Sequence, residues 1–467
     1  MTAKYTVQEL VDLQIIEKPL DGNHGSIHPT SKDYVEDGIP FIMASDLSNG
    51  LVNFSSCKFI TEKQANTLRK GFSIAGDILL SHKATIGRTA TVQENKYPFL
   101  VLTPQVTYYR VKDKQKLNNL YLKYYFDSQY FQSILQQWAG SGSTRAYIGI
   151  TEQLKLPIIL PDIDTQNEIV DIINRLDQKI YINTQINQTL EQIAQALFKS
   201  WFVDFDPVRA KVQALSDGMS LEQAELAAMQ AISGKTAEEL TALSQTQPDR
   251  YAELAETAKA FPCEMVEIDG VEVPKGWELK ALSDLGQIIC GKTPSKSNKE
   301  FYGDDVPFIK IPDMHNQVFI TQTTDNLSVA GANSQSKKYI PPKSICVSCI
   351  ATVGLVSMTS KPSHTNQQIN SIIPNDEQTS EFLYLSLKQP SMTKYLKDLA
   401  SGGSATLNLN TRTFSKIEII TPSKEIIDIF HNKVYYFFEK TLSNTIENKR
   451  LAKTRELLLP RLLNGEI

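Results

Sequence analysis

Two long stretches of the chain show the same helical spacing of apolar residues. Their seam positions alternate at spacings of four and three, which is typical of the a and d positions of a coiled coil. In residues 161–205 these positions are Ile169, Ile173, Leu176, Ile180, Asn183, Asn187, Leu190, Ala194, Leu197 and Trp201. In residues 423–467 they are Phe430, Val434, Phe437, Thr441, Asn444, Asn448, Leu451, Arg455, Leu458 and Leu462. Each stripe predicts a helix of about 33 residues, roughly 50 Å long at about 1.5 Å per residue.

Two asparagines occupy equivalent positions in each stripe, Asn183 and Asn187 in the first and Asn444 and Asn448 in the second. A buried asparagine fixes the register of a coiled coil and lowers its stability, so we expect these four residues to set the register. An amphipathic helix more commonly packs on its own domain. However, a domain of about 150 residues is only about 30 to 40 Å across. Helices of this length therefore favour antiparallel packing against each other.

The remainder of the chain contains an internal repeat. At an offset of 267 residues, Pro40-Phe41-Ile42 matches Pro307-Phe308-Ile309, and Ala84-Thr85-Ile86-Gly87 matches Ala351-Thr352-Val353-Gly354. At an offset of 261, residues 139–161 align with residues 400–422 without a gap. Each copy mixes short apolar runs with Gly, Pro, Asn and Ser, which predicts an α+β domain. The predicted fold is two homologous α+β domains, residues 1–160 and 273–422, in a pseudo-twofold arrangement and joined by the two helices.

The segment 206–272 has no counterpart after the second helix. Residues 204–272 contain 14 Asp and Glu against 5 Lys and Arg, and their Ala, Glu and Leu content predicts two short, exposed, acidic helices. The simple interpretation is a connector, and the sharper hypothesis is a docking surface for a partner subunit. The whole chain has a net charge of −4. The residues outside this segment are therefore mildly basic, which permits binding to nucleic acid.

Composition also indicates the compartment. The chain has 5 cysteines in 467 residues, as expected in a reducing environment. It has no run of 18 apolar residues and no apolar signal region at the N-terminus. We therefore expect a cytoplasmic protein that does not contact a membrane.

Several motifs suggest catalysis or metal binding, and the sequence argues against each. Residues 286–293, GQIICGKT, fit the phosphate-binding pattern, but the flanking residues are too polar for a buried strand and Pro294 follows where a helix should begin.

Cys346 and Cys349 lie in a predicted strand that turns them to opposite faces, so core positions are favoured over zinc. Asp177 and Lys179 imitate a nuclease pattern but lie in the heptad helix, where charges usually face solvent. Asp206-Pro207-Val208-Arg209 lacks the second proline and the aromatic residue of an adenine methyltransferase motif.

Two similar domains held apart by a stiff spacer could contact two separated places on DNA, whose half-sites recur about every 34 Å. Loops in both copies carry Arg, Lys, Asn, Gln, Ser and Thr, which can contact base edges or phosphate. The candidate DNA-binding residues in the first copy are Ser81, His82, Lys83, Thr85, Arg88, Ser143, Thr144 and Arg145. Those in the second copy are Lys292, Thr293, Ser295, Thr352, Asn366, Gln367, Gln368, Ser404, Thr406 and Asn408.

The ends of both helices resemble a known family. LFKSWFVDFDPV (197–208) and LLLPRLLNGEI (457–467) are similar to the conserved regions of specificity subunits of type I restriction-modification enzymes. The paired segments IPFIMASDL and VPFIKIPDM, and the CGKTPS loop, resemble segments of that family's target recognition domains. The resemblance covers nearly the whole chain.

This resemblance implies a non-catalytic subunit that recognises a split, asymmetric DNA sequence. It implies target recognition domains at 1–160 and 273–422, spacer helices at 161–205 and 423–467 that set the gap and dock methyltransferase subunits, and a connector at 206–272. It further implies two methyltransferase subunits that bring S-adenosylmethionine, and motor-nuclease subunits that bring ATP and magnesium. We expect this chain itself to bind double-stranded DNA and no cofactor or metal. The alternatives are a nucleotide-dependent enzyme that uses Gly286–Thr293, and a coiled-coil scaffold that does not contact DNA.

Overall fold

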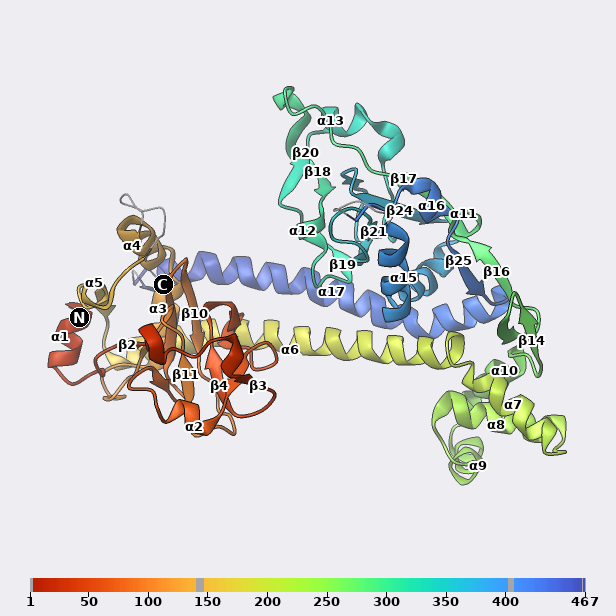
Figure 1. Cartoon of the computed structure of the whole chain (residues 1–467), viewed down its shortest axis with the longest axis horizontal. Helices are drawn as coiled ribbons and strands as arrows, with labels where there is room; N and C mark the ends of the chain where they lie inside the picture. The colour runs from red at the N-terminus through yellow and green to blue at the C-terminus, as the bar shows by residue number, and fades with distance from the viewer. Residues whose placement is uncertain (1–2, 140–146, 402–406, 464, 467) are drawn as a thin grey trace. The chain divides into compact units, whose positions relative to one another are not determined.

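A computed structural model describes residues 3–139, 147–401, 407–463, 465 and 466. The chain forms two compact units (Figure 1). Unit 1 contains the residues up to Ile180 together with those from Lys449 onward, and unit 2 contains Tyr181–Asn448. Both long helices, α6 (Ile163–Phe202) and α17 (Lys424–Leu463), therefore contribute residues to both units. Within the described ranges, no helix is both long and apolar enough to cross a membrane.

Unit 1 is built on two mixed β-sheets. The six-stranded sheet runs, in spatial order, through β2 (Leu20–Asp21), β12 (Val106–Tyr109), β9 (Ile78–Lys83), β10 (Thr85–Thr91), β6 (Gly50–Val52) and β5 (Leu47–Ser48). The five-stranded sheet runs through β3 (Tyr34–Val35), β7 (Lys58–Ile60), β4 (Ile39–Ile42), β11 (Leu100–Leu102) and β8 (Phe72–Ser73). A separate antiparallel pair joins β1 (Ala3–Thr6) to β13 (Pro157–Leu160). The helices are α1 (Val7–Asp12), α2 (Glu62–Ala65), α3 (Asn119–Asp127), α4 (Gln129–Ala139) and α5 (Ile150–Gln153).

Unit 2 repeats this plan. Its larger sheet runs through β17 (Gly286–Cys290), β24 (Ile369–Pro374), β21 (Ile345–Ser348), β22 (Val356–Thr359) and β19 (Phe319–Ile320). The smaller sheet runs through β20 (Asp325–Leu327), β18 (Tyr302–Ile309) and β23 (His364–Thr365), and β16 (Glu278–Ala281) pairs with β25 (Glu418–Thr421). The helices are α11 (Leu282–Leu285), α12 (Ile311–Met314), α13 (Val329–Asn333), α14 (Ser380–Lys388), α15 (Pro390–Ala400) and α16 (Thr411–Ser415).

The strands that the two units share agree in order and pairing, as the internal repeat predicts, although these sheets have six and five strands in unit 1 and five and three in unit 2. The parallel pair β4 and β11 places Phe41 opposite Val101, and the parallel pair β18 and β23 places Phe308 opposite His364. The predicted duplication of an α+β domain is therefore confirmed at the level of strand pairing within each unit.

The connector segment, residues 206–272, forms four helices rather than the two that the sequence predicts. They are α7 (Asp206–Ser216), α8 (Leu221–Ser233), α9 (Ala237–Thr246) and α10 (Pro248–Ala260), followed by the hairpin of β14 (Met265–Ile268) and β15 (Val271–Pro274). Thr236 caps α9 through its hydroxyl, and Pro248 begins α10. Ala228, Met229, Leu240, Leu254 and Ala258 form a small core of their own. The short helices have too few apolar residues for a clear helical period, which explains why the pattern underestimated their number.

Within unit 2, α6 and α17 pack antiparallel along the predicted seam. Asn444 Nδ2 donates to Asn187 Oδ1 at 2.9 Å, and Asn183 Nδ2 donates to Asn448 Oδ1 at 2.9 Å and to Glu447 Oε2 at 2.7 Å. Asn183 and Asn444 are buried, and their own carbonyl oxygens have no hydrogen-bond partner in the described part of the chain. The predicted asparagine positions therefore meet across the seam, at an energetic cost that supports a role in register.

The helices hold the rest of unit 1 through charged side chains. Arg455 Nη1 of α17 donates to Asp177 Oδ1 of α6 at 2.6 Å. Lys123 of α3 lies 3.5 Å from Asp177 and 2.9 Å from Asp127. Asp127 in turn accepts a hydrogen bond from Thr89 of β10. Asp177 is therefore a partly buried ion-pair partner, and the expectation that it faces solvent was wrong.

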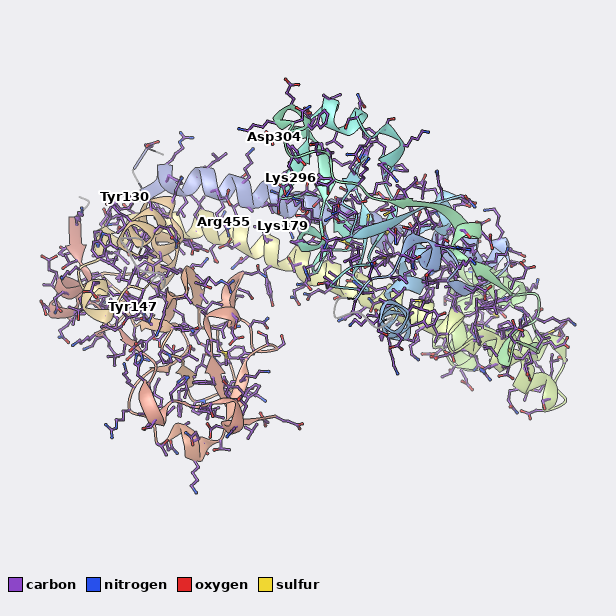
Figure 2. The ribbon with its side chains drawn as sticks, turned by 45° about the horizontal axis from the view of Figure 1, so that its top comes forward. Tyr130, Tyr147, Lys179, Lys296, Asp304 and Arg455 are labelled. Carbon is purple, nitrogen blue, oxygen red and sulfur yellow. The ribbon has the colours of Figure 1, made fainter. Side chains whose placement is uncertain are left out.

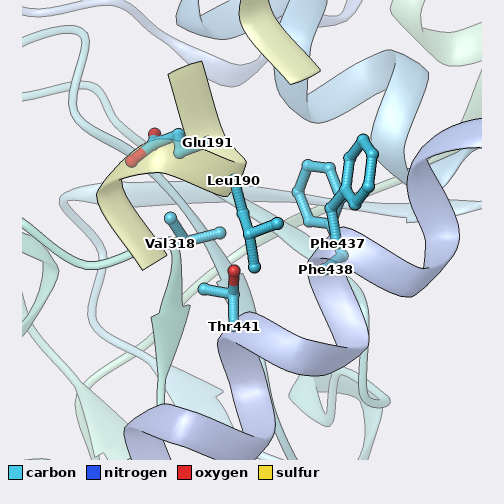
Figure 3. Close-up of a pocket in the computed structure, with 6 residues that line it drawn as sticks. All are labelled: Leu190, Glu191, Val318, Phe437, Phe438 and Thr441. Atoms are coloured by element: carbon cyan, nitrogen blue, oxygen red, sulfur yellow. The ribbon is translucent and has the colours of Figure 1, made fainter. Parts of the chain in front are cut away.

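The equivalent positions in unit 2 hold aromatic side chains instead. Tyr384 occupies the position of Lys123, Phe438 that of Asp177, and their rings pack edge to face with centroids 5.7 Å apart. Figure 3 shows Phe437, Phe438 and Thr441 of α17 facing Leu190 of α6 around a small cavity that Val318 also lines. The two units thus use different chemistry to pack against the same pair of helices.

The asparagine pair leads to a stability prediction. Replacing Asn444 with Ala leaves Asn187 Oδ1 without its donor, so we expect a loss of about 1–3 kcal/mol in the free energy of unfolding. Replacing both partners, N187L with N444L, removes this hydrogen bond together with the unsatisfied Asn444 Oδ1 and should be neutral or stabilising. Thermal unfolding of the full chain, followed by circular dichroism, measures both. A double variant that melts as low as the single variant would contradict this account.

Candidate nucleic-acid interface

A tight hairpin between β9 and β10 organises the candidate loops of unit 1. Ala84 at its turn has a φ of 66° and Gly87 a φ of 91°, and the strand register shifts between Ile86 and Thr89. Positive φ favours glycine, so the Ala84 conformation must be held by its surroundings. One such restraint is the Arg88 amide, which donates to Ser81 Oγ at 2.9 Å.

The second unit has the same hairpin. Ala351 has a φ of 63° and Gly354 a φ of 93°. The Leu355 amide donates to Ser348 Oγ at 2.9 Å, in the same way that the Arg88 amide donates to Ser81. The repeat therefore preserves strained backbone as well as sequence.

A distant segment lies along each hairpin and is held by main-chain hydrogen bonds. In unit 1 the Ile148 amide donates to His82 O at 3.0 Å, and Lys83 pairs with Tyr147 in an isolated antiparallel bridge. In unit 2 the Leu409 amide donates to Cys349 O at 2.8 Å, and Ile350 pairs with Asn408. We call the hairpin and this crossing segment the hairpin framework. It brings loops from separate parts of each domain to one place.

The structure separates the predicted residues of unit 1 into two groups. Thr85 and Arg88 are exposed and Lys83 is half-buried. Arg88 also donates from its guanidinium to Ala44 O at 3.2 Å. Ser81 and His82 are buried; Ser81 Oγ accepts from the Arg88 amide, and His82 Nδ1 lies 3.0 Å from Ile148 O. Ser143, Thr144 and Arg145 lie outside the described residues.

In unit 2 the predicted residues from three loops lie together. Thr293 Oγ1 donates to Gln367 Oε1 at 2.6 Å, and the Cys349 amide of the hairpin donates to Gln368 O at 2.8 Å. Asn366 is buried and its Nδ2 donates to Gln368 Oε1 at 2.9 Å. Other predicted residues expose their side chains near this junction; they are Lys292, Ser295, Gln367, Thr352 and Asn408. Ser404 and Thr406 lie outside the described residues.

Residues 286–293 do not have the geometry of a phosphate-binding loop. Gly286–Cys290 is an edge strand of an antiparallel pair, and the next helical turn begins only at Lys299. The amides of Gly291 and Lys292 donate to Ile369 O at 3.1 Å and to Thr365 O at 3.0 Å. These N–H groups would be needed to bind phosphate. At Gly291 a Cβ atom would lie 2.1 Å from Asn366 O, so the glycine permits close contact between two loops.

The cysteine pair is part of the core, as predicted. Cys346 and Cys349 are buried and belong to different hydrophobic clusters on the two faces of the sheet. Burial raises the pKa of Cys346 to about 12 and that of Cys349 to about 11, so both thiols remain protonated at neutral pH. Among the described residues, no group of three or more His, Cys, Asp or Glu side chains could hold a metal ion.

Tyr147 is a surface residue at this site that the sequence analysis did not select. Its ring is half exposed, its centroid lies 5.6 Å from that of the His82 ring, and Lys83 Nζ lies 5.8 Å from its centroid. The repeat at offset 261 places Tyr147 over Asn408, which was selected. This alignment could therefore have identified Tyr147 from the sequence.

A family model matches this chain, and its relatives include two specificity subunits. The model, described as the type I restriction modification DNA specificity domain, matches residues 9–192 and again residues 274–457. The type I restriction enzyme HindI specificity subunit of Haemophilus influenzae is 81% identical over 345 residues, which cover 73% of this chain and 74% of that relative. The putative type I restriction enzyme MjaX specificity subunit of Methanocaldococcus jannaschii is 21% identical over 478 residues, covering 99% of this chain and 93% of that relative.

A solved structure has a similar fold. The crystal structure of the type I restriction-modification system S subunit from M. genitalium has a TM-score of 0.52 and 13% identity, and the match covers 99% of this chain and 96% of that one. The two stretches matched by the family model each contain one hairpin framework.

The buried histidines lead to a pH prediction. Burial lowers the pKa of His82 to about 4, and burial likewise lowers the pKa of His364 in unit 2 to about 4. An unfolded chain binds these protons near pH 6.5, so the folded protein loses stability as pH falls from about 6.5 towards 4. Each histidine should contribute up to about 1.4 kcal/mol per pH unit in that window.

The test compares melting temperatures between pH 7 and 4.5. His82→Asn keeps a donor for Ile148 O and should make the pH dependence shallower. His315→Asn, at an exposed position, should leave the dependence unchanged. Equal slopes for the wild type and His82→Asn would exclude this contribution.

Proposed function

Because the chain belongs to the family of type I restriction-modification DNA specificity subunits, we propose that each α+β unit recognises one half of a split, asymmetric DNA sequence. The observation that carries this proposal is the duplicated hairpin framework. Both copies have the same backbone restraints, but their exposed side chains differ. The same scaffold with different base-contacting groups is suited to two different half-sites.

The unit 1 contacts that we propose come from Lys83, Thr85 and Arg88, with Ser143, Thr144 and Arg145 as further candidates from the sequence. The unit 2 contacts come from the loops that carry Lys292, Thr293, Ser295, Thr352, Gln367, Gln368 and Asn408, with Ser404 and Thr406 as further candidates. Burial removes Ser81, His82 and Asn366 from the set of direct contacts that we propose. In our proposal α6 and α17 set the number of base pairs between the half-sites.

A second stripe on α6 supports docking of methyltransferase subunits. Ile182, Ile186 and Ile193 are 52%, 36% and 46% exposed, and with Thr189 they alternate at spacings of four and three. This stripe lies outside the seam occupied by α17. A stripe of exposed apolar residues at heptad spacing is suited to a partner helix. On α17, Tyr436 and Leu457 are also exposed, by 69% and 62%, and lie three heptads apart.

Under this proposal the partner subunits supply catalysis. The methyltransferase subunits bring S-adenosylmethionine, the motor-nuclease subunits bring ATP and magnesium, and this chain supplies recognition. The occupied amides of the Gly286–Thr293 segment favour this division over a nucleotide-binding role for the chain itself.

The modular function is tested by a domain exchange. Residues 1–160 are replaced with the corresponding domain of another specificity subunit, and the complex with methyltransferase subunits is assayed by mapping methylated sites. We expect one half of the methylated sequence to change and the other half to remain. A change in both halves would refute modular recognition. If the assembled wild-type complex binds no duplex at any salt concentration, the coiled-coil scaffold is the better account.

The docking stripe is tested by charge insertion. Ile186→Glu with Ile193→Glu should abolish co-purification with the methyltransferase subunit, because two carboxylates would be desolvated in the interface. Both positions are exposed in this chain, so its own melting temperature should change little. Gln185→Glu with Gln192→Glu adds the same charge on the same helix outside the stripe and serves as the matched control. Normal assembly of the isoleucine variant would place docking elsewhere.

A further inference from the structure

The hairpin framework identifies positions that are equivalent in the two units. Four of these positions hold the same residue in both copies: Ser81 and Ser348, Ala84 and Ala351, Thr85 and Thr352, and Gly87 and Gly354. Of these pairs, the serines, alanines and glycines shape the turn. Three other positions differ sharply in chemistry: Lys83 against Ile350, Arg88 against Leu355, and Tyr147 against Asn408.

The three differing residues of unit 1 lie on one hairpin framework. Lys83 and Tyr147 are paired across the isolated bridge, and Lys83 Nζ lies over the tyrosine ring at 5.8 Å from its centroid. The centroid of the buried His82 ring lies 5.6 Å from that of the Tyr147 ring. Arg88 lies on the opposite strand, within the register shift between Ile86 and Thr89. Two cations and one aromatic ring are therefore presented by a backbone that is restrained from several directions.

From this arrangement we infer that Lys83, Arg88 and Tyr147 are the specificity-determining residues of unit 1 and that they contact a guanine in its half-site. The inference rests on the proposed function and names the chemistry of that site. Guanine presents two acceptors, N7 and O6, in the major groove, and lysine and arginine are the side chains that donate to both. The Tyr147 ring restricts the Lys83 ammonium by a cation–π contact and limits the positions that it can reach.

Unit 2 presents different groups at the same framework positions. Ile350 and Leu355 are apolar, and Asn408 stands where Tyr147 stands in unit 1. Gln367, held by Thr293, adds a second amide nearby. Amide side chains pair with adenine rather than guanine. This difference between the units explains how two copies of one scaffold can recognise the two different halves of an asymmetric DNA sequence.

The experiment uses the complete complex with its methyltransferase subunits and a plasmid library in which every position of the wild-type site is varied. Methylated positions are mapped by sequencing. Lys83→Ile and Tyr147→Asn install the residues of the second copy. We expect Lys83→Ile to reduce discrimination for guanine at one position of one half-site by about tenfold or more. Lys83→Arg should retain the preference for guanine, and the other half-site should be unchanged in every variant.

Two matched controls test whether any surface change has this effect. Tyr130 on α4 is 45% exposed, similar to Tyr147 at 47%, and lies apart from Tyr147 on the same unit (Figure 2). Tyr130→Asn and Lys114→Ile should leave the methylated sequence and the melting temperature unchanged. Wild-type melting temperatures for the Lys83 and Tyr147 variants will show that these variants are folded.

The outcomes separate the inference from the function on which it rests. If folded Lys83→Ile and Tyr147→Asn variants methylate the wild-type sequence, the inference is wrong and the proposed function stands. A uniform loss of methylation across all sequences of the library would assign these residues to phosphate and would also overturn the inference. If the wild-type complex shows no split recognition sequence, the proposed function itself is wrong.

Discussion

The pairing of α6 with α17 is the interaction on which both units depend. Each helix has an apolar seam that must be buried, and each unit completes its core with residues from both helices. In unit 1, Ile173 of α6 and Leu459 and Leu462 of α17 join one hydrophobic cluster. In unit 2, Trp201 and Phe430 belong to the core that contains the main sheet. Neither unit is therefore an independent module in the thermodynamic sense, although each has its own sheets.

The two units show how a duplicated scaffold can keep its backbone while its exposed side chains differ. Main-chain hydrogen bonds and positive φ angles fix the hairpin framework, and these restraints depend little on the exposed side chains. Positions such as Lys83 and Ile350 can then differ without loss of the fold. The packing against the helices differs as well, with the ion pair of Lys123 and Asp177 in unit 1 and the aromatic contact of Tyr384 with Phe438 in unit 2. Partly buried charges have strict geometric requirements, whereas aromatic packing tolerates small shifts.

The sequence predicted the large features of the fold because they are periodic or repeated. The heptad stripes predicted both long helices, and the offset of 267 residues predicted that Ala84 and Ala351 are equivalent. The sequence did not predict features that depend on contacts between residues distant in the chain. His82 is hydrogen-bonded to the segment at Ile148, which is distant in the chain. The pairing of Asp177 depends on Arg455, which no local pattern connects to it. The short connector helices lacked the length that makes a helical period recognisable.

The membership of residues 449–467 in unit 1 has a consequence for biosynthesis. The first domain emerges from the ribosome long before Leu459, Leu462 and Arg455, which cover its apolar surface and neutralise Asp177, have been made. During that interval the nascent first domain exposes the apolar face of α6 without its partner, a state in which newly made chains associate with one another or with chaperones. Shortening the chain at its last helix would consequently damage the domain that is translated first.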